Sequence, residues 1–142
     1  MNRKMIFLAA ALVSALAAPV LASAATVPVT RLVLASASLG AEARAGAFAG
    51  EPALLPDAYA ELTAGGVKVC ETEVAVDTFE PVWQQPCSLR VAPAAELRLE
   101  VRSFAPEGDR LLGTWVGTLR DLGAARGPLA FGTVRSFRVA VE

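Results

Sequence analysis

The strongest constraint on the fold is a strict alternation of apolar and charged residues late in the chain. Residues 97–102 read Leu-Arg-Leu-Glu-Val-Arg, and residues 136–141 alternate in the same way. A period of two gives one apolar and one polar face, which is typical of a half-buried antiparallel β-strand. Further strands are predicted over residues 28–36, 58–63, 67–76, 82–91 and 112–119. About seven short strands without a long helical period predict an all-β sandwich or barrel.

Glycine and proline mark the connections between these strands. Gly65-Gly66 predicts a hairpin turn. Residues 39–57 form a long connection rich in Ala and Gly, with one or two helical turns expected over Ala41 to Ala49. Residues 121–133 are expected to be irregular. Connections as long as residues 39–57 often carry function.

The N-terminus has the three parts of an export signal. Arg3 and Lys4 precede an apolar run, and Ala22-Ser23-Ala24 supplies a small-residue cleavage site. An uncleaved membrane anchor is the alternative, but the run is shorter than the roughly 20 residues that span a bilayer, and Pro19 interrupts it. We therefore predict a signal peptide over residues 1–24, a single domain over residues 25–142, and a periplasmic or secreted protein.

Composition excludes several classes of function. Removal of Arg3 and Lys4 leaves 11 basic against 14 acidic residues, a net charge of about −3, which argues against nucleic-acid binding. The chain contains no His, so Ser-His and Cys-His pairs are impossible. We expect a binding protein rather than an enzyme, with a hydrolase of unknown chemistry as a remote alternative.

The two cysteines, Cys70 and Cys87, are predicted to form a disulfide. An even pair in an exported chain indicates a bridge, and the lack of His and of C-x-x-C spacing makes a metal site a weak alternative. If residues 67–76 and 82–91 form a hairpin in which Val74 faces Trp83, Cys70 lies directly opposite Cys87 on the core side.

Three segments, in order, resemble one known family. Residues 56–62 (PDAYAEL) are similar to its D-P-Y-V-x-V segment, and residues 72–83 (TEVAVDTFEPVW) match T-x-V-x-x-x-T-x-N-P-V-W except that Glu80 replaces Asn. Residues 96–101 are similar to the family's L-x-x-x-V strand, and residues 111–113, which follow after a loop, are similar to its F-I-G segment. The chain thus resembles the C2 domain family, the calcium-dependent phospholipid-binding module. The residues that match its structural motifs are Tyr59, Thr72, Val74, Thr78, Pro81, Trp83 and Gly113.

The resemblance implies an eight-stranded antiparallel sandwich with variable loops clustered at one end. Calcium-binding members use about five carboxylates, because calcium takes six to eight oxygen ligands. Asp57 matches one of them, and Glu51 lies at the spacing of its partner. The acidic positions of the third loop fall instead on Ser103, Ala105 and Arg110. We expect a degenerate calcium site and no other cofactor.

Two alternatives remain open at this site. Weak calcium binding would use Glu51, Asp57 and Asp109, with Glu107 also near the third loop. Asp57 could instead accept hydrogen bonds from backbone N–H groups of its own turn.

Two kinds of surface could contact a membrane or a partner: charged strand faces and apolar loop tips. The strand that is lysine-rich in lipid-binding relatives has one Lys and two Glu over residues 67–73, so it should not attract anionic lipid. A basic patch from Arg98, Arg102, Arg135 and Arg138 is the alternative to an ordinary solvated face. Apolar candidates for contact, unless they fold back onto the core, are Phe48, Leu54, Leu55, Phe104 and Pro106.

These patterns predict an exported, non-enzymatic C2-like module that contacts a protein partner or a membrane surface through its loop end, without calcium. Weak calcium-dependent phospholipid binding through Asp57 and Glu51 is the alternative function.

Overall fold

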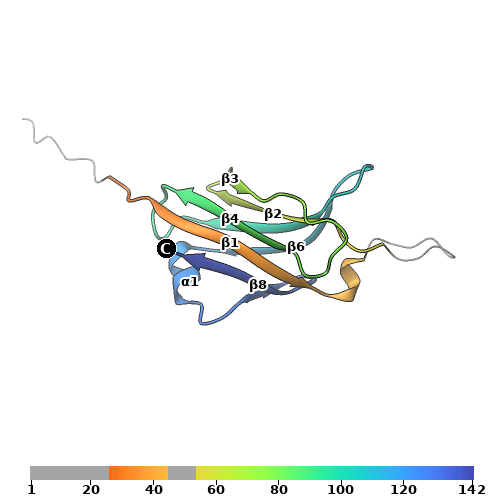
Figure 1. Cartoon of the computed structure of the whole chain (residues 1–142). Helices are drawn as coiled ribbons and strands as arrows, with labels where there is room; N and C mark the ends of the chain where they lie inside the picture. The colour runs from red at the N-terminus through yellow and green to blue at the C-terminus, as the bar shows by residue number, and fades with distance from the viewer. Residues whose placement is uncertain (1–25, 45–53) are drawn as a thin grey trace, which may run out of the picture.

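The computed structural model describes residues 26–44 and 54–142, which form a sandwich of two four-stranded antiparallel sheets (Figure 1). The elements in chain order are β1 (Thr30–Leu39), η1 (Ala41–Ala43), β2 (Ala58–Ala64), β3 (Val67–Glu71), β4 (Val82–Leu89), β5 (Leu97–Ser103), β6 (Arg110–Gly117), α1 (Leu119–Ala124), β7 (Leu129–Phe131) and β8 (Val134–Val141). Sheet A has the strand order β4-β1-β8-β7, and sheet B has the order β3-β2-β5-β6. The expected all-β, eight-stranded sandwich is confirmed, whereas the expected signal peptide lies outside the described residues.

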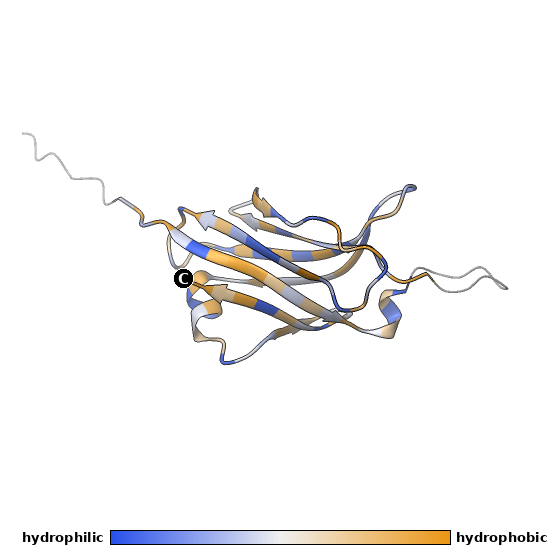
Figure 2. Cartoon of the chain, in the orientation of Figure 1, coloured by the Kyte–Doolittle hydropathy of each residue, from blue (hydrophilic) through white to orange (hydrophobic). Residues whose placement is uncertain are grey.

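The core lies between the facing sides of the two sheets. The apolar residues of β5 are buried, as the alternation predicts, and Figure 2 shows hydrophobic and hydrophilic residues alternating along β8. Phe137 of β8 is fully buried, with the ring of Trp83 at 5.8 Å and that of Phe131 at 6.0 Å between centroids. Within the described ranges, no helix is long and apolar enough to cross a membrane.

Two residues of the family motifs hold elements together. Trp83 of β4 donates its Nε1–H to the carbonyl of Ala58 in β2 at 3.3 Å, which links sheet A to sheet B. A Cβ atom on Gly113 would lie 2.6 Å from the carbonyl oxygen of Phe131, so only glycine allows β6 and β7 to pack this closely. The motif residues therefore act in the scaffold.

The expected hairpin between residues 67–76 and 82–91 is wrong. β3 is an edge strand of sheet B and pairs with β2, whereas β4 is an edge strand of sheet A and pairs with β1. The residues between them cross from one sheet to the other, and only a bridge from Ala75 to Ala58 continues the pairing. Because the two strands belong to different sheets, Val74 and Trp83 are not partners in one ladder.

A side chain ends β3 earlier than the alternation predicts. The hydroxyl of Thr72 accepts a hydrogen bond from the N–H of Ala60 at 2.9 Å, in the place of a backbone carbonyl. Asp77 then takes a left-handed conformation with φ 50°. The period of two is lost between these residues. A continued alternation would place Val74 and Val76 on the core side together with Cys70, but both are exposed.

The predicted disulfide between Cys70 and Cys87 is present in the structure. The two Cα atoms are 5.7 Å apart, and Cys87 is buried in the core. The bridge joins β3 to β4, so it connects the edges of two sheets rather than neighbouring strands of one sheet.

A short helix replaces part of the stretch expected to be irregular. β6 ends at Gly117, two residues earlier than predicted, and α1 begins after Thr118. The Thr118 hydroxyl accepts from the N–H of Asp121, and the Asp121 carboxylate accepts from the N–H of Thr118. This reciprocal capping box, readable as T-x-x-D, satisfies donors that a helix start leaves free.

Three connections lie at one end of the sandwich, as expected (Figure 1). They are loop 1 (residues 40–57, described at 40–44 and 54–57), loop 2 (residues 72–81) and loop 3 (residues 104–109), and we call them together the loop end. The two ends of the domain lie at the opposite side, where the N–H of Glu142 donates to the carbonyl of Arg31 at 2.9 Å. A tether at either end of the domain would therefore leave the loop end accessible.

Candidate functional site

Hydrogen bonds between backbone groups bring the loops of the loop end together. The N–H of Phe104 in loop 3 donates to the carbonyl of Asp57 in loop 1 at 2.8 Å. The N–H of Thr78 in loop 2 donates to the carbonyl of Pro56 at 3.1 Å. Loop 1 thus contacts both other loops through two consecutive residues.

Asp57, the residue that matches the family's carboxylate, is engaged within the loop end. Its Oδ1 accepts a hydrogen bond from the N–H of Asp77 in loop 2 at 2.8 Å. The carboxylate therefore accepts from a backbone N–H, as in the simpler of the two expectations for Asp57, but from one in loop 2 and not in its own turn. The sequence reasoning did not single out Asp77, although an Asp in a short polar segment is a common turn residue.

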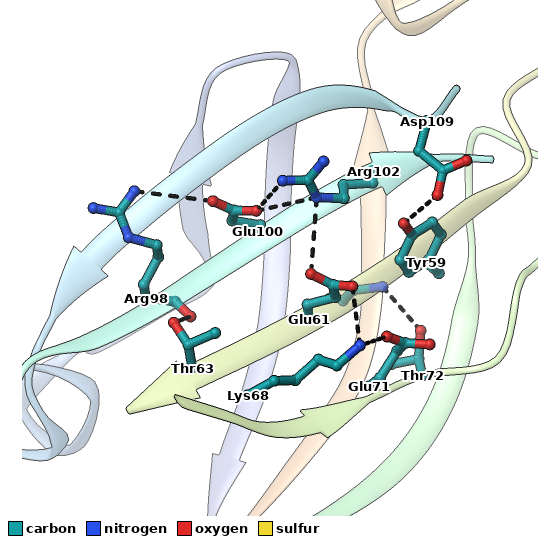
Figure 3. Close-up of polar contacts among 11 residues, drawn as sticks. Tyr59, Glu61, Thr63, Lys68, Glu71, Thr72, Arg98, Glu100, Arg102 and Asp109 are labelled. Atoms are coloured by element: carbon teal, nitrogen blue, oxygen red, sulfur yellow. Dashed lines mark hydrogen bonds and ion pairs between the residues drawn. The ribbon is translucent and has the colours of Figure 1, made fainter. Parts of the chain in front are cut away.

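Asp109 is held by contacts inside sheet B and loop 3 (Figure 3). The hydroxyl of Tyr59, on β2, donates to Oδ2, and the N–H of Ala105 donates to Oδ1 at 3.1 Å. These hydrogen bonds, first that of Tyr59, lower the pKa of Asp109 below its usual range. Burial, followed by the bond to Asp109, raises the pKa of Tyr59 above its usual range. At neutral pH the pair is a protonated phenol and a carboxylate.

The arginine at an expected acidic position joins the start of β6 to loop 1. Nη2 of Arg110, the first residue of β6, donates to the carbonyl of Ala43 in η1. Arg44, the next residue of loop 1, places its guanidinium 5.3 Å from the centroid of the Phe79 ring in loop 2. Two cationic side chains therefore help to hold the loops, and this role was not predicted from the sequence.

The described residues do not assemble a metal centre. Asp57 and Asp109 accept from different donors, and no group of three or more His, Cys, Asp or Glu side chains is placed to hold a metal ion in residues 26–44 and 54–142. Glu51, the third residue of the expected weak calcium site, lies outside the described residues.

Apolar side chains are exposed at the loop end. Leu54 is 66% exposed and Leu55 is 38% exposed in loop 1, while Phe104 in loop 3 is 51% exposed. Pro106 is also exposed, and Phe48 lies outside the described residues. The alternative, that these side chains fold back onto the core, is wrong for the four that the structure describes, Leu54, Leu55, Phe104 and Pro106.

Exposed apolar residues in loop 2 and at the start of β6 were missed by the sequence reasoning. Val76 in loop 2 is 66% exposed, and Leu111 at the start of β6 is about half exposed. The alternation assigned Val76 to the core, and no sequence signal separates it from a buried strand residue. All three loops therefore carry exposed apolar groups.

The outer face of sheet B is a neutralised network of charges (Figure 3). Lys68 forms ion pairs with Glu71 and Glu61, which raise the pKa of Lys68, first through the hydrogen bond to Glu71. On β5, Nη2 of Arg102 is 2.6 Å from a carboxylate oxygen of Glu100. The expectation that this surface lacks the positive charge to attract anionic lipid is consistent with the alternating pairs.

The alternative basic patch does not form, because its members lie in different sheets. Arg98 and Arg102 are on β5 of sheet B and pair with Glu100. Arg135 and Arg138 are on β8 of sheet A. Two strands of separate sheets cannot present one continuous outer face.

The comparison with protein families decides the classification. A model of the C2 domain matches residues 41–130, which is more than half of the chain. The chain belongs to the C2 domain family. C2 domains are in general lipid- or protein-binding modules rather than catalytic ones. No curated protein matches this C2 domain.

Solved structures share the fold at low sequence identity. The calcium-bound tandem C2 domains of extended-synaptotagmin 2 superpose with a TM-score of 0.68 and 19% identity, covering 82% of this C2 domain chain and 45% of that one. A structure described as a C2 domain gives a TM-score of 0.55 and 20% identity, over 80% of this chain and 97% of that one. Human GIVD cytosolic phospholipase A2 superposes with a TM-score of 0.56 and 17% identity, covering 80% of this chain and 16% of that one.

The match to GIVD phospholipase A2 covers only a small share of a much larger protein. This C2 domain likewise spans less than half of the extended-synaptotagmin 2 chain. The likeness therefore concerns the scaffold, and function depends on what the loops of this chain present.

Proposed function

We propose that this C2 domain is exported and binds a membrane surface through its loop end, without calcium. The observation that carries the proposal is the exposure of apolar side chains on all three loops at the same end of the sandwich. Exposed apolar groups that gather at one place mark a surface for a membrane or a protein. Export is supported by the disulfide, because such bonds persist in oxidising compartments.

A membrane fits this surface better than a protein partner does. Leu54, Val76 and Phe104 stand on separate loops, and acidic residues lie close to them in the chain, Asp77 next to Val76 and Glu107 after Phe104. A protein interface needs a closely packed apolar centre, whereas a bilayer accepts separate apolar side chains without a matching shape. The apolar atoms enter the acyl boundary while the charged groups remain at the headgroups.

Contacts within the loop end support independence from calcium. The described carboxylates of Asp57 and Asp109 are already bonded to N–H and O–H donors of the chain. Arg110 adds a positive charge at the same end, and like charges repel. The loops are therefore in contact without a metal ion between them.

Co-sedimentation with lipid vesicles tests the proposal. The oxidised protein, expressed from the full-length sequence, is mixed with phosphatidylcholine vesicles, with and without phosphatidylserine, in calcium and in chelator. We expect the protein to pellet with vesicles in chelator. Phe104→Ala should weaken binding about tenfold, because moving a phenyl ring from water into the bilayer contributes about 1.4 kcal/mol or more to the binding free energy.

A matched pair of variants controls for general surface effects. Val76 in loop 2 and Val67 at the opposite end of sheet B are each 66% exposed. Val76→Asp should abolish pelleting, while Val67→Asp should leave it unchanged. Equal effects of both variants, or no pelleting with any vesicle, would overturn the proposal and redirect the search to a protein partner.

Calcium-dependent phospholipid binding is the second candidate function. It would use Asp57 and Glu51, and it is favoured by Asp57, which matches a carboxylate of calcium-binding family members and lies in loop 1 at the loop end. Pelleting only in calcium, lost in Asp57→Asn, would support this function and replace the first.

A further inference from the structure

Loop 3 presents Phe104 from a turn with two anchors. The N–H of Phe104 is bound by the carbonyl of Asp57, and the N–H of the next residue, Ala105, is bound by the carboxylate of Asp109. The turn is closed by the N–H of Gly108, which donates to the carbonyl of Ala105 at 3.0 Å. Hydrogen bonds to Asp57 and Asp109 thus fix the backbone N–H groups of Phe104 and of the residue after it, and they leave the Phe104 side chain free to contact a ligand.

The anchor at Asp109 depends on a residue of sheet B. Tyr59 of β2 is only 8% exposed, and its hydroxyl donates to the second oxygen of the Asp109 carboxylate (Figure 3). One carboxylate therefore joins the sheet to the turn of loop 3, because one oxygen accepts from the Tyr59 hydroxyl and the other accepts from the Ala105 N–H. The contact with loop 3 is made by the hydroxyl of Tyr59.

We propose that Tyr59 and Asp109 are positioning residues that hold loop 3 in the form in which Phe104 binds. The proposal rests on the membrane function given above and names what organises that same site. An ordered loop loses less conformational entropy on binding than a free one, so the bond raises affinity without touching the ligand.

The hydroxyl of Tyr59 offers a clean test, because Tyr59→Phe removes one atom and keeps the ring. We expect this variant to bind phosphatidylcholine vesicles about fivefold more weakly, the usual effect of one lost hydrogen bond. Its melting temperature should fall by no more than the few degrees that one hydrogen bond contributes. The amides of residues 104–108 should exchange with solvent faster than in the wild type.

A double-mutant cycle with Phe104→Ala separates positioning from general support. If Tyr59 acts through Phe104, adding Tyr59→Phe to Phe104→Ala should change binding by less than about twofold. Asp109→Asn serves as a second variant should Tyr59→Phe disturb the fold. Its matched control is Glu107→Gln, which removes the same charge from the same loop, because Glu107 has no hydrogen bond or ion pair within the part of the chain that is described.

Each outcome decides between the two proposals. Additive losses in the cycle, or full binding by Tyr59→Phe while Phe104→Ala binds weakly, overturn the positioning role and leave the membrane function standing. Full binding by Phe104→Ala removes the membrane role of loop 3, and the positioning role falls with it. Equal losses in Asp109→Asn and Glu107→Gln would assign the effect to charge and also overturn the inference.

Discussion

Cys70 and Cys87 lie on different sheets, and the disulfide between them joins the two edge strands β3 and β4. Both strands border the same open side of the sandwich, where loop 2 crosses from one sheet to the other. No ladder of backbone hydrogen bonds connects β3 to β4. The covalent bond therefore secures a side of the sandwich that pairing does not close.

Removal of this bond should lower the free energy of unfolding substantially. The disulfide spans 17 residues, and closing a loop of this size stabilises a fold by about 3 kcal/mol in the chain-entropy model. We expect Cys70→Ser with Cys87→Ser to lose about that amount in urea denaturation. A loss below about 1 kcal/mol would show that the unfolded chain gains little freedom when the bond is absent.

The buried ring of Phe137 should be the most costly aromatic to remove. It contacts rings from both β4 and β7 and is fully buried, so Phe137→Ala should lose about 3–5 kcal/mol of unfolding free energy. Phe104→Ala is the control, because its side chain is half exposed and should change stability by less than about 0.5 kcal/mol. Thermal denaturation of both variants measures the difference, and similar losses would contradict the assignment of Phe137 to the core.

The fold was predictable where residue patterns reflect local burial. The alternation in β5 gives its inward face directly, and Gly65-Gly66 marks the turn between β2 and β3. In β8 the alternation identifies the buried Phe137, but Val141 on the same face is exposed. The same rule failed between β3 and β4, because Thr72 replaces a backbone acceptor and ends the period of two. The assumed hairpin placed Cys70 opposite Cys87, and the disulfide is present although the hairpin is not. The pairing was therefore correct for the wrong reason, because a disulfide between two sheets needs the same short distance as one between neighbouring strands.

The candidate site was only partly predictable, because its contacts join residues far apart in the chain. Leu54, Leu55 and Phe104 could be selected as apolar residues in loops. The contact from Arg110 to Ala43 spans 67 residues, and that from Tyr59 to Asp109 spans 50. Only the folded chain brings these groups together, so neither pattern nor spacing predicts them.

Calcium should leave the stability of the protein unchanged. Asp57 and Asp109 already accept hydrogen bonds from the chain, and a cation would have to break them to use the same oxygens. We expect equal melting temperatures in calcium and in chelator, measured by differential scanning fluorimetry. A rise in calcium that disappears in Asp57→Asn would contradict this and favour the second candidate function, since a ligand of the native state stabilises it.

Loop 3 should loosen in acid as Asp109 takes up a proton. Hydrogen bonds from Tyr59 and then from the Ala105 N–H lower the pKa of Asp109 in the folded protein below its ordinary value of 3.8. A group with a lowered folded pKa stabilises the native state above its unfolded pKa. The stabilisation is therefore complete above about pH 3.8 and is lost as the pH falls through the lower folded value.

The titration of the Asp109 carboxyl carbon, followed by NMR, measures this directly. Tyr59→Phe removes the largest cause of the shift, so it should raise the pKa of Asp109 toward 3.8. The Ala105 amide should report the same transition, because its N–H donates to the same carboxylate. An Asp109 pKa that is equal in the wild type and in Tyr59→Phe would mean that the phenol does not donate to the carboxylate in solution, and loop 3 would then lack its link to sheet B.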